Sequence, residues 1–216
     1  MPVYYENHYL TRPDWPVTGG SVAATLTAHG VTVGDGTVFC DVPRVAFTHA
    51  TDLEAGVPAA GRRAFRGAIT LGAGCYVESG VAPAFPSQPV KLSSIKVNDG
   101  PPGRIVVGDR VVLQGVAVVA YDLVEIGDDV IFGPMVTVMD SSGHPLRGRG
   151  EPGEAARTRS APVRIGAGAW IGAGATILKG VEIGAGAVVG TQSVVHESVP
   201  AGAVVVGNPA RVVKRL

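Results

Sequence analysis

A single histidine stands in the longest break of an otherwise repetitive sequence, and its setting favours acid–base chemistry. His144 follows Asp140 by four positions, and after Pro145 an Arg- and Gly-rich stretch continues to Pro162. A break of this length inside a repeating fold is uncommon unless it is functional or disordered. An imidazole with an ordinary pKa of about 6.5 can take a proton from a hydroxyl or an amine at neutral pH. We therefore expect His144 to be a general base, with Asp140 orienting the ring, holding an acceptor or lying solvated.

The residues that must position this loop follow a period of six. An aliphatic residue returns at every sixth position, at Ile165, Ile171, Ile177, Ile183, Val189 and Val195. A small or short-branched residue follows each of the first five, at Ala169, Ala175, Val181, Ala187 and Ser193. This period fits neither an amphipathic helix nor a plain strand. It predicts an all-β solenoid, a parallel β-helix of hexapeptide repeats whose short strands are joined by glycine corners.

The same period divides the chain. Residues 1–32 carry no repeat and are expected to be an irregular N-terminal segment, in which 21–29 could form a short helix or a strand. The β-helix is expected over 33–199, with projecting loop insertions at 48–66, 82–102 and 139–164, followed by a C-terminal turn and basic tail at 200–216. The expected core positions of its central coils are Val107, Leu113, Val119, Ile126, Phe132 and Val138.

Composition narrows the classes of partner. The chain has 18 basic and 18 acidic residues and no long run of either sign, so nothing favours nucleic acid or an anionic membrane. Cys40 and Cys75 are too few for a disulfide framework, and Cys75 falls at a small-residue position, which predicts a buried packing role. The first nine residues lack an apolar run, so we expect no signal peptide or membrane anchor and a cytoplasmic location.

Four segments together resemble the hexapeptide-repeat acyltransferases, and most of all the maltose- and galactoside-type sugar O-acetyltransferases. They are Ser142-Gly143-His144-Pro145, Pro162-Val163-Arg164-Ile165-Gly166, Ala169-Trp170-Ile171-Gly172-Ala173-Gly174 and Gly207-Asn208-Pro209-Ala210-Arg211. The resemblance covers the part of the chain from Val107 onward. It implies a left-handed parallel β-helix and a homotrimer with active sites between subunits. The implied activity is acetyl-CoA-dependent O-acetyltransfer to a hydroxyl, or to an amine, of a small acceptor such as a sugar or secondary metabolite.

The resemblance also implies roles for single residues. His144 matches the loop histidine that serves as general base in the family. The positions that hold the pantetheine arm of acetyl-CoA match Trp170, Ala173 and Thr191 here. The CoA phosphate is expected to meet Arg211 or Lys214, because the usual lysine of the family is replaced by Glu197.

Acceptor recognition departs from the galactoside-specific relatives. The Asn and the acidic residue that face the base in those proteins align with Gly115 and Tyr121, and Asp122 is one residue away. We therefore expect a different small acceptor, contacted by Tyr121, Asp122 and Asp140. The insertions at 48–66 and 82–102 could add contacts to this acceptor or be structural.

Two other functions compete with this interpretation. A γ-class zinc carbonic anhydrase shares the fold but needs three histidines around its metal. The five histidines here, His8, His29, His49, His144 and His196, lack the close pair of such a site, so no metal is expected. A non-catalytic assembly scaffold would leave the loop histidine unexplained. Trp170 should point outward, because it precedes the inward Ile171, and it could be a trimer-interface aromatic as well as a cofactor contact.

Overall fold

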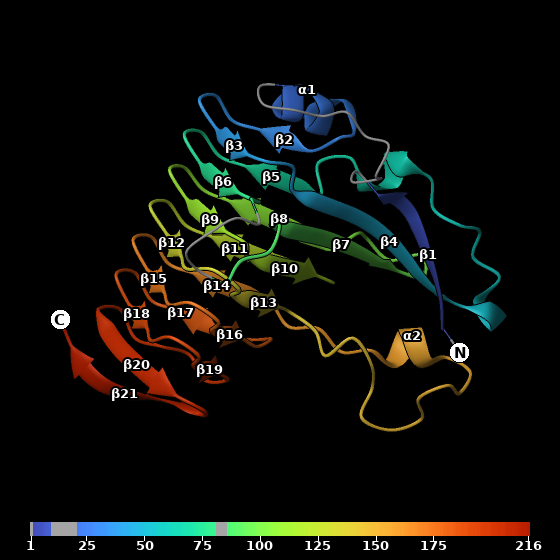
Figure 1. Ribbon diagram of the computed structural model, residues 1–216. Coiled ribbons are helices and arrows are strands. Elements are labelled where there is room, and N and C mark those ends of the chain that lie inside the picture. The colour runs from blue at the N-terminus through green and yellow to red at the C-terminus, as the bar shows by residue number, and fades with distance from the viewer. Residues whose placement is uncertain (1, 10–20, 81–85) are drawn as a thin grey trace.

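The computed structural model describes residues 21–80 and 86–216, and the backbone of residues 2–9. Over these residues the chain winds into stacked coils whose strands form three sheets (Figure 1). Neighbouring strands within a sheet mostly differ by three in chain order, so each coil adds one strand to every sheet. The pairing is parallel except for the first and last strands, which are antiparallel to their neighbours. The predicted all-β solenoid of parallel strands is confirmed.

The three sheets are named here A, B and C. Sheet A has the order β1 (Pro2–Tyr9), β4 (Arg44–Asp52), β7 (Lys91–Val97), β10 (Ala117–Ala120), β13 (Thr137–Met139), β16 (Thr176–Ile177) and β19 (Val194–Val195). Sheet B has the order β17 (Glu182–Ile183), β14 (Val163–Ile165), β11 (Leu123–Ile126), β8 (Arg104–Val107), β5 (Ile69–Leu71) and β2 (Thr32–Val33). Sheet C has the order β21 (Ala210–Arg215), β20 (Ala203–Gly207), β18 (Val188–Val189), β15 (Trp170–Ile171), β12 (Ile131–Phe132), β9 (Val112–Gln114), β6 (Tyr76–Glu78) and β3 (Val38–Cys40).

Three columns of paired apolar side chains fill the inside of the coil. They are Val45, Leu92, Val118, Val138, Ile177 and Val195 in sheet A, Leu71, Val107, Ile126, Ile165 and Ile183 in sheet B, and Val77, Leu113, Phe132, Ile171, Val189 and Val205 in sheet C. All are buried, as are all the aliphatic and small positions predicted between 165 and 195. Burying one such side chain contributes about 1.5–3 kcal/mol, so these columns hold the coil together. Cys75 is buried at its small-residue position, and burial raises the pKa of its thiol, as expected for a packing residue.

One predicted core position is wrong. Val119 is only half-buried, whereas Val118 is fully buried and pairs with Val138 in the sheet A column. The cause is the corner at Gly115, whose left-handed residue (φ of 53°) comes two residues after the inward Leu113, whereas it comes three residues after the inward residue at corners such as those of Gly168 and Gly174. This corner is tight, so the step from Leu113 to the next inward residue is one residue shorter than the period.

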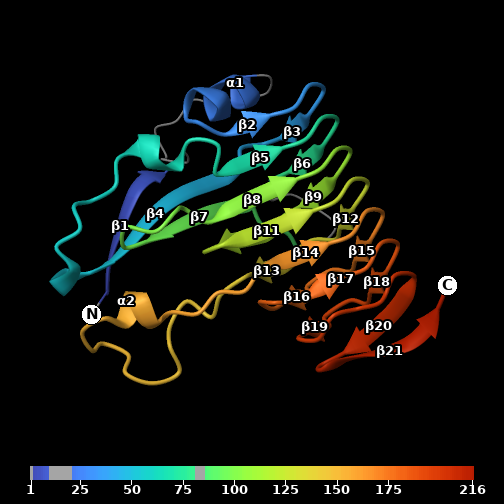
Figure 2. The ribbon, with the colours of Figure 1, turned by 180° about the vertical axis from the view of Figure 1, so that it is seen from behind.

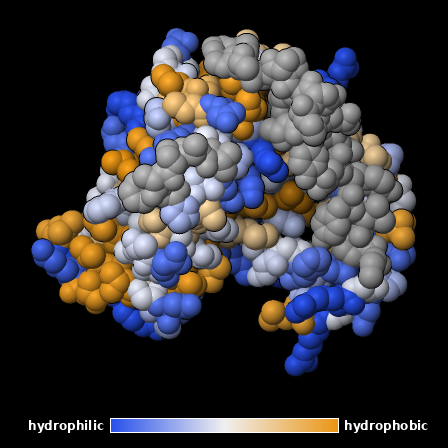
Figure 3. Space-filling view, in the orientation of Figure 1, coloured by the Kyte–Doolittle hydropathy of each residue, from blue (hydrophilic) through white to orange (hydrophobic). Residues whose placement is uncertain are grey.

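The two ends of the core are closed differently. Helix α1 (Ser21–Ala28) covers the first coil with the buried Val22 and Leu26. At the other end the antiparallel hairpin of β20 and β21 closes the last coil and carries an apolar patch, visible at the lower left of Figure 3. Among the described residues no helix is both long and apolar enough to cross a membrane.

The N-terminal region departs from the sequence prediction. An irregular segment was expected over 1–32, with a short helix or a strand at 21–29; the structure forms helix α1 there and, unexpectedly, strand β1, and residues 10–20 lie outside the described part. The reason is that β4 is nine residues long and continues beyond the coil with β7 beside it. This extension leaves a sheet edge with unpaired backbone groups, and β1 covers that edge.

The three insertions acquire partial structure. The 48–66 segment is strand up to Asp52 and then forms the 3-10 turns η1 (Leu53–Ala55) and η2 (Arg62–Phe65). The 82–102 segment contains β7, and its residues 82–85 lie outside the described part. The 139–164 segment contains the four-residue helix α2 (Glu154–Arg157), which lies away from the coil beside the ends of β1 and β4 (Figures 1 and 2).

Candidate functional site

The loop of residues 140–162, called here the His144 loop, leaves the coil after β13 and returns at β14. Gly143 has a φ of 73°, so the chain turns through the left-handed region immediately before His144. The His144 side chain is 53% exposed, and its Nδ1 lies 2.7 Å from Oε1 of Glu154. An imidazole that is partly exposed and held by a carboxylate is suited to proton transfer.

Glu154 is the first residue of α2, and its side chain is only 3% exposed. Its second carboxylate oxygen, Oε2, accepts the backbone N–H of Gly150. The N–H of Gly150 and the imidazole of His144 hold the pKa of Glu154 below its usual range. Glu154 is therefore an anion at neutral pH, held in one orientation by the turn that precedes α2.

This contact decides which ring nitrogen of His144 can act as a base. An ionised carboxylate can only accept hydrogen bonds, so Nδ1 of His144 carries the proton that is donated to Glu154. Nε2 is then the ring atom that can take a proton from an acceptor. The arrangement orients the ring, fixes its tautomer and stabilises the imidazolium that forms, which are the three roles of a carboxylate behind a catalytic histidine.

Asp140 occupies a different place from the one that the sequence suggested. It is fully buried, and its two oxygens accept the backbone N–H groups of Tyr121 and Asp122 at 2.7 Å each. Burial raises the pKa of Asp140, although these hydrogen bonds and one from Leu123 oppose the effect. Asp140 therefore holds the turn between β10 and β11 at the root of the loop. The carboxylate that orients His144 in the structure is Glu154.

The turn that Asp140 holds brings Tyr121 to the base. A Cβ placed on Gly143 would lie 3.7 Å from the Tyr121 hydroxyl and 3.5 Å from the Met139 methyl group. Tyr121 therefore lies beside the residue that precedes His144, and Asp122 is exposed on the same turn. The structure brings these two predicted acceptor contacts to the His144 loop.

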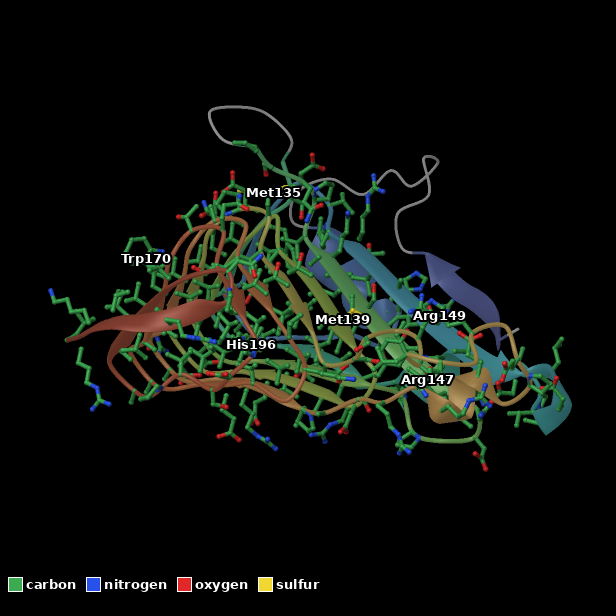
Figure 4. The ribbon with its side chains drawn as sticks, turned by 90° about the horizontal axis from the view of Figure 1, so that it is seen from below. Met135, Met139, Arg147, Arg149, Trp170 and His196 are labelled. Atoms are coloured by element: carbon green, nitrogen blue, oxygen red, sulfur yellow. The ribbon has the colours of Figure 1, made fainter. Side chains whose placement is uncertain are left out.

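Three of the five predicted cofactor residues line a pocket of about 510 Å³ at the corner between sheets C and A. Its lining includes Trp170, Ala173 and Thr191, and at its other end Glu78, Ser87 and Gln114. Trp170 is 56% exposed and points away from the coil, as predicted (Figure 4).

The corner residues of this pocket offer backbone donors. Within the described part of the chain, the N–H groups of Ala173 and Thr191 have no hydrogen-bond acceptor, whereas the adjacent Gly172 N–H donates to Val189. Unpaired N–H groups beside an exposed indole fit the amides of an extended, partly apolar chain. Pantetheine is a chain of this kind.

Arg211 and Lys214 lie on β21, the last strand of sheet C. The Arg211 guanidinium is 3.2 Å from Nε2 of His196 and 3.6 Å from the carboxylate of Glu197. Glu197, which replaces the usual lysine, thus partly neutralises the arginine expected to bind phosphate. Lys214 is exposed on the last strand.

Within one protomer, His144 and the Trp170 pocket are separate. His144 is not among the residues that line the Trp170 pocket. In Figure 4, Arg147 and Arg149 of the His144 loop lie on the opposite side of the molecule from Trp170. The proposed base and the cofactor groove therefore do not meet within a single chain.

His49, one of the histidines weighed for a zinc site, is used inside the protein. Its Nδ1 accepts the N–H of Ala60 at 2.9 Å, and its Nε2 lies 2.6 Å from the carbonyl oxygen of Asn98, to which it donates. With both ring nitrogens engaged, His49 has no lone pair for a metal. Among the described residues no group of three or more His, Cys, Asp or Glu is placed to hold a metal ion.

Sequence reasoning missed Glu154 and the polar end of the pocket. Glu154 lies ten positions after His144 in a stretch without periodicity, and only its place at the start of a short Ala-rich segment, Glu154-Ala155-Ala156-Arg157, marks it. The side-chain amide of Gln114 donates to Glu78 at 3.1 Å. That contact joins neighbouring coils, so it becomes visible only once strands β6 and β9 are paired.

Part of the chain is similar in sequence to known proteins. Residues 162–197 match the family model described as bacterial transferase hexapeptide (six repeats). A stretch of 89 residues, 41% of this chain, is 53% identical to Nodulation protein L of Rhizobium meliloti (strain 1021). An 89-residue match of the same identity is found with Nodulation protein L of Rhizobium leguminosarum bv. viciae. These matches cover 47% and 45% of the two proteins, so the chain spans about half the length of the curated relatives it matches.

Among solved structures, the N-acyltransferase AntD from Bacillus cereus, in complex with dTDP and 3-hydroxybutyryl-CoA, superimposes with a TM-score of 0.61 at 19% identity over 89% of this chain and 87% of that one. A mutant of AntD in complex with dTDP-4-amino-4,6-dideoxyglucose and coenzyme A gives a TM-score of 0.60 at 18% identity over 89% and 88% of the two chains. These structures share the fold. With the family match, they confirm the resemblance to the hexapeptide-repeat transferases.

Proposed function

We propose that this chain, whose repeats are those of the bacterial hexapeptide transferases, is an acetyl-CoA-dependent acetyltransferase. It moves the acetyl group to a hydroxyl or an amine of a small acceptor, and His144 is its general base. The observation that supports this most is the pair formed by the exposed His144 ring and the buried, ionised Glu154. A non-catalytic scaffold would have no use for a histidine whose tautomer is fixed by a buried carboxylate.

The chemistry follows from this pair. Nε2 of His144 removes the proton from the acceptor oxygen or nitrogen as that atom attacks the thioester carbonyl carbon. The C–S bond then breaks, and the imidazolium returns the proton to the departing CoA sulfur. A thiolate is a good leaving group, so no stronger acid is required. Backbone N–H groups at the corners of the coil are suited to stabilise the oxyanion that develops in between.

The Trp170 pocket is the proposed groove for the acetyl donor. The indole of Trp170 and the unpaired N–H groups of Ala173 and Thr191 would hold the pantetheine arm. Lys214 and Arg211 would contact the CoA phosphates, with Lys214 the stronger candidate because Glu197 already partners Arg211.

A homotrimer of left-handed coils would complete the site. Arg147 and Arg149 of the His144 loop lie on the opposite side of one protomer from Trp170 (Figure 4), and His144 does not line the Trp170 pocket, so the two would face each other only across a contact between subunits. We propose that His144 of one protomer serves the groove of the next. On this arrangement each of the three clefts contains one base and one donor groove.

The acceptor is proposed to contact Tyr121 and Asp122 near the base. Asp140 would not touch the acceptor itself; it would hold the turn that carries Tyr121 and Asp122. AntD was crystallised with an amino sugar nucleotide, so amines belong beside hydroxyls in any screen of acceptors.

The test measures release of free CoA thiol from acetyl-CoA over a panel of sugar, amino-sugar and small alcohol acceptors. Wild-type protein should release thiol with at least one acceptor, and His144→Ala should lower kcat by about 10²–10⁴. Leu146→Ala, in the same loop and 88% exposed, is the matched control and should keep wild-type turnover. Acetyl-CoA should raise the Tm of all three proteins. If acetyl-CoA leaves the Tm unchanged, the scaffold function gains and the enzyme proposal fails.

A further inference from the structure

A buried carboxylate far from His144 in sequence contacts helix α2 of the His144 loop. Asp52, at the end of β4, is 5% exposed. Its two oxygens accept the backbone N–H groups of Ala155 and Ala156, at 2.7 and 2.9 Å, from α2. These two residues follow Glu154 directly. Asp52 therefore fixes the segment of backbone that carries the partner of the base.

Asp52 is itself held from the other side. The side-chain amide of Asn98 donates to Oδ2 of Asp52 at 3.1 Å, and the backbone N–H of Asp52 donates to Oδ1 of Asn98 at 2.9 Å. The carbonyl of Asn98 accepts from His49. Asn98 has a φ of 47°, a left-handed conformation that asparagine tolerates better than most residues, so the turn after β7 presents this amide to Asp52.

The groups form one continuous chain of contacts. It runs from His49 through Asn98 and Asp52 to the first turn of α2, then through Glu154 to Nδ1 of His144. Burial raises the pKa of Asp52, but the hydrogen bonds from Asn98 and α2, with the charge of Arg157, outweigh it and leave the pKa below its usual value. Asp52 is thus an anion that the network stabilises.

The buried carboxylates and buried histidine of the described residues belong to one part of the fold. They are His49, Asp52, Asp140 and Glu154. Burying such groups is costly unless they are paired and hydrogen-bonded. Asp140 and Glu154 lie in the His144 loop, Asp52 contacts the helix α2 of that loop, and His49 is joined to Asp52 through Asn98.

We propose that Asp52 is a positioning residue for the general base: by holding α2 against the extension of β4 and β7, it keeps Glu154 directed at Nδ1 of His144. The proposal rests on the proposed function, since it assumes that His144 is the base. It assigns a role to the insertions at 48–66 and 82–102, whose strand extensions carry Asp52 and Asn98. These segments act on catalysis through the loop.

The experiment compares Asp52→Asn with Glu54→Gln, which removes a charge from an exposed position two residues away. An asparagine offers one oxygen where Asp52 offers two to the α2 backbone, so α2 should shift. Asp52→Asn should lower kcat about ten- to 100-fold, the effect expected for a displacement of about 1 Å at a reacting group. The KM for acetyl-CoA should stay within about twofold, because the Trp170 pocket is not part of this network.

A second readout does not depend on any acceptor. In protein labelled with ¹⁵N-histidine, the His144 ring should show the Nδ1–H tautomer in the wild type and in Glu54→Gln, and a mixture of tautomers in Asp52→Asn. The His144 signal is assigned by its loss in His144→Ala. If wild-type protein fails to transfer acetyl groups, the proposed function fails while this measurement still judges the positioning role.

A further variant covers the case in which Asp52→Asn does not fold. Asn98→Gly keeps the left-handed turn and removes only the amide that supports Asp52, so it should cause a smaller loss in the same direction. Wild-type tautomer and wild-type kcat in whichever of the two variants folds would overturn the proposal. A loss of kcat accompanied by an equal rise in KM for acetyl-CoA would overturn it as well, because it would indicate general disruption of the fold.

Discussion

The contact between Glu154 and His144 allows a prediction from atom types alone. Glu154→Gln keeps the size of the side chain and leaves it one acceptor oxygen and one NH₂ group. Two donors now face this side chain, the N–H of Gly150 and Nδ1–H of His144. The amide oxygen can serve only one of them. If it serves Gly150, the NH₂ group faces Nδ1, and the ring proton must move to Nε2, where it blocks the base.

The magnitude follows from the cost of the active orientation. To keep Nδ1–H bonded, the amide must turn its NH₂ group toward the Gly150 N–H and leave that donor unsatisfied. Such a cost reduces the population of the active tautomer by roughly 5- to 150-fold. Gly150 is exposed, so water compensates part of the loss. We therefore expect kcat to fall about tenfold.

The assay is steady-state release of CoA thiol, with kcat and both KM values determined. Glu151→Gln is the matched control, since it removes the same charge from an exposed position in the same loop. Only Glu154→Gln should lower kcat, and the KM for acetyl-CoA should be unchanged. Equal kcat in the two variants would refute the claim that Glu154 sets the tautomer. A thousandfold loss would also refute the reasoning, because it would exceed the whole cost assigned to the unsatisfied donor.

Three further predictions concern the groove, the coil and the network. Trp170→Ala should raise the KM for acetyl-CoA about tenfold or more, as expected for an aromatic anchor. Ile131→Ala, on the neighbouring strand, is the control and should leave this KM unchanged. A fall in trimer stability in both variants would favour an interface role for Trp170. A Cβ on Gly166 would lie 2.5 Å from a backbone nitrogen of the next coil, so Gly166→Ala should lower the Tm by about 2–12 °C. Gly61→Ala, with nothing within 4 Å of its Cβ, should leave the Tm unchanged. The folded pKa of Asp52 lies below its ordinary 3.8, so its stabilising contribution is complete above that pH and lost as pH falls below it. The Tm difference between wild type and Asp52→Asn should therefore be constant from about pH 7 to pH 5 and shrink below about pH 4.

The coil could be predicted because its rule is local and repeated. Each inward residue in 165–195 lies six positions from the next, and small residues occupy the corners. Trp170 could be placed outward for the same reason, since strand neighbours face opposite sides. The rule failed at Val119 because the left-handed residue of one corner, Gly115, comes two residues after the inward Leu113 and not three, as at the corners within 165–195. A change of one residue cannot be detected from hydrophobicity when Val118 and Val119 are both valine.

The contacts that hold the His144 loop could not be predicted, because they join distant segments of the chain. Asp52 and Ala155 are separated by 103 positions, and no period relates them. Asp140 was the natural choice to orient His144, since it lies four residues away. In the structure the backbone of a neighbouring turn takes both of its oxygens. Proximity in sequence was a poor guide here because the loop folds back on itself before α2 begins.

The regularity of the coil limits where the proposed base could be carried. Inward positions must be apolar to form the columns, and the corner glycines lie against the next coil: a Cβ on Gly172 would lie 2.7 Å from the backbone nitrogen of Thr191. Such corners can offer backbone N–H groups to a ligand, but they cannot carry a long ionisable side chain toward it. Ionisable side chains on the coil itself, such as Arg110 and Asp129, pair with one another across neighbouring coils. The proposed base, His144, sits instead on a segment that leaves the coil. Once outside, that segment loses the coil's ladder of hydrogen bonds, and its orientation has to come from other contacts. The buried carboxylates of Asp52 and Glu154 provide them, and this accounts for costly buried charges in a chain whose repeats need none.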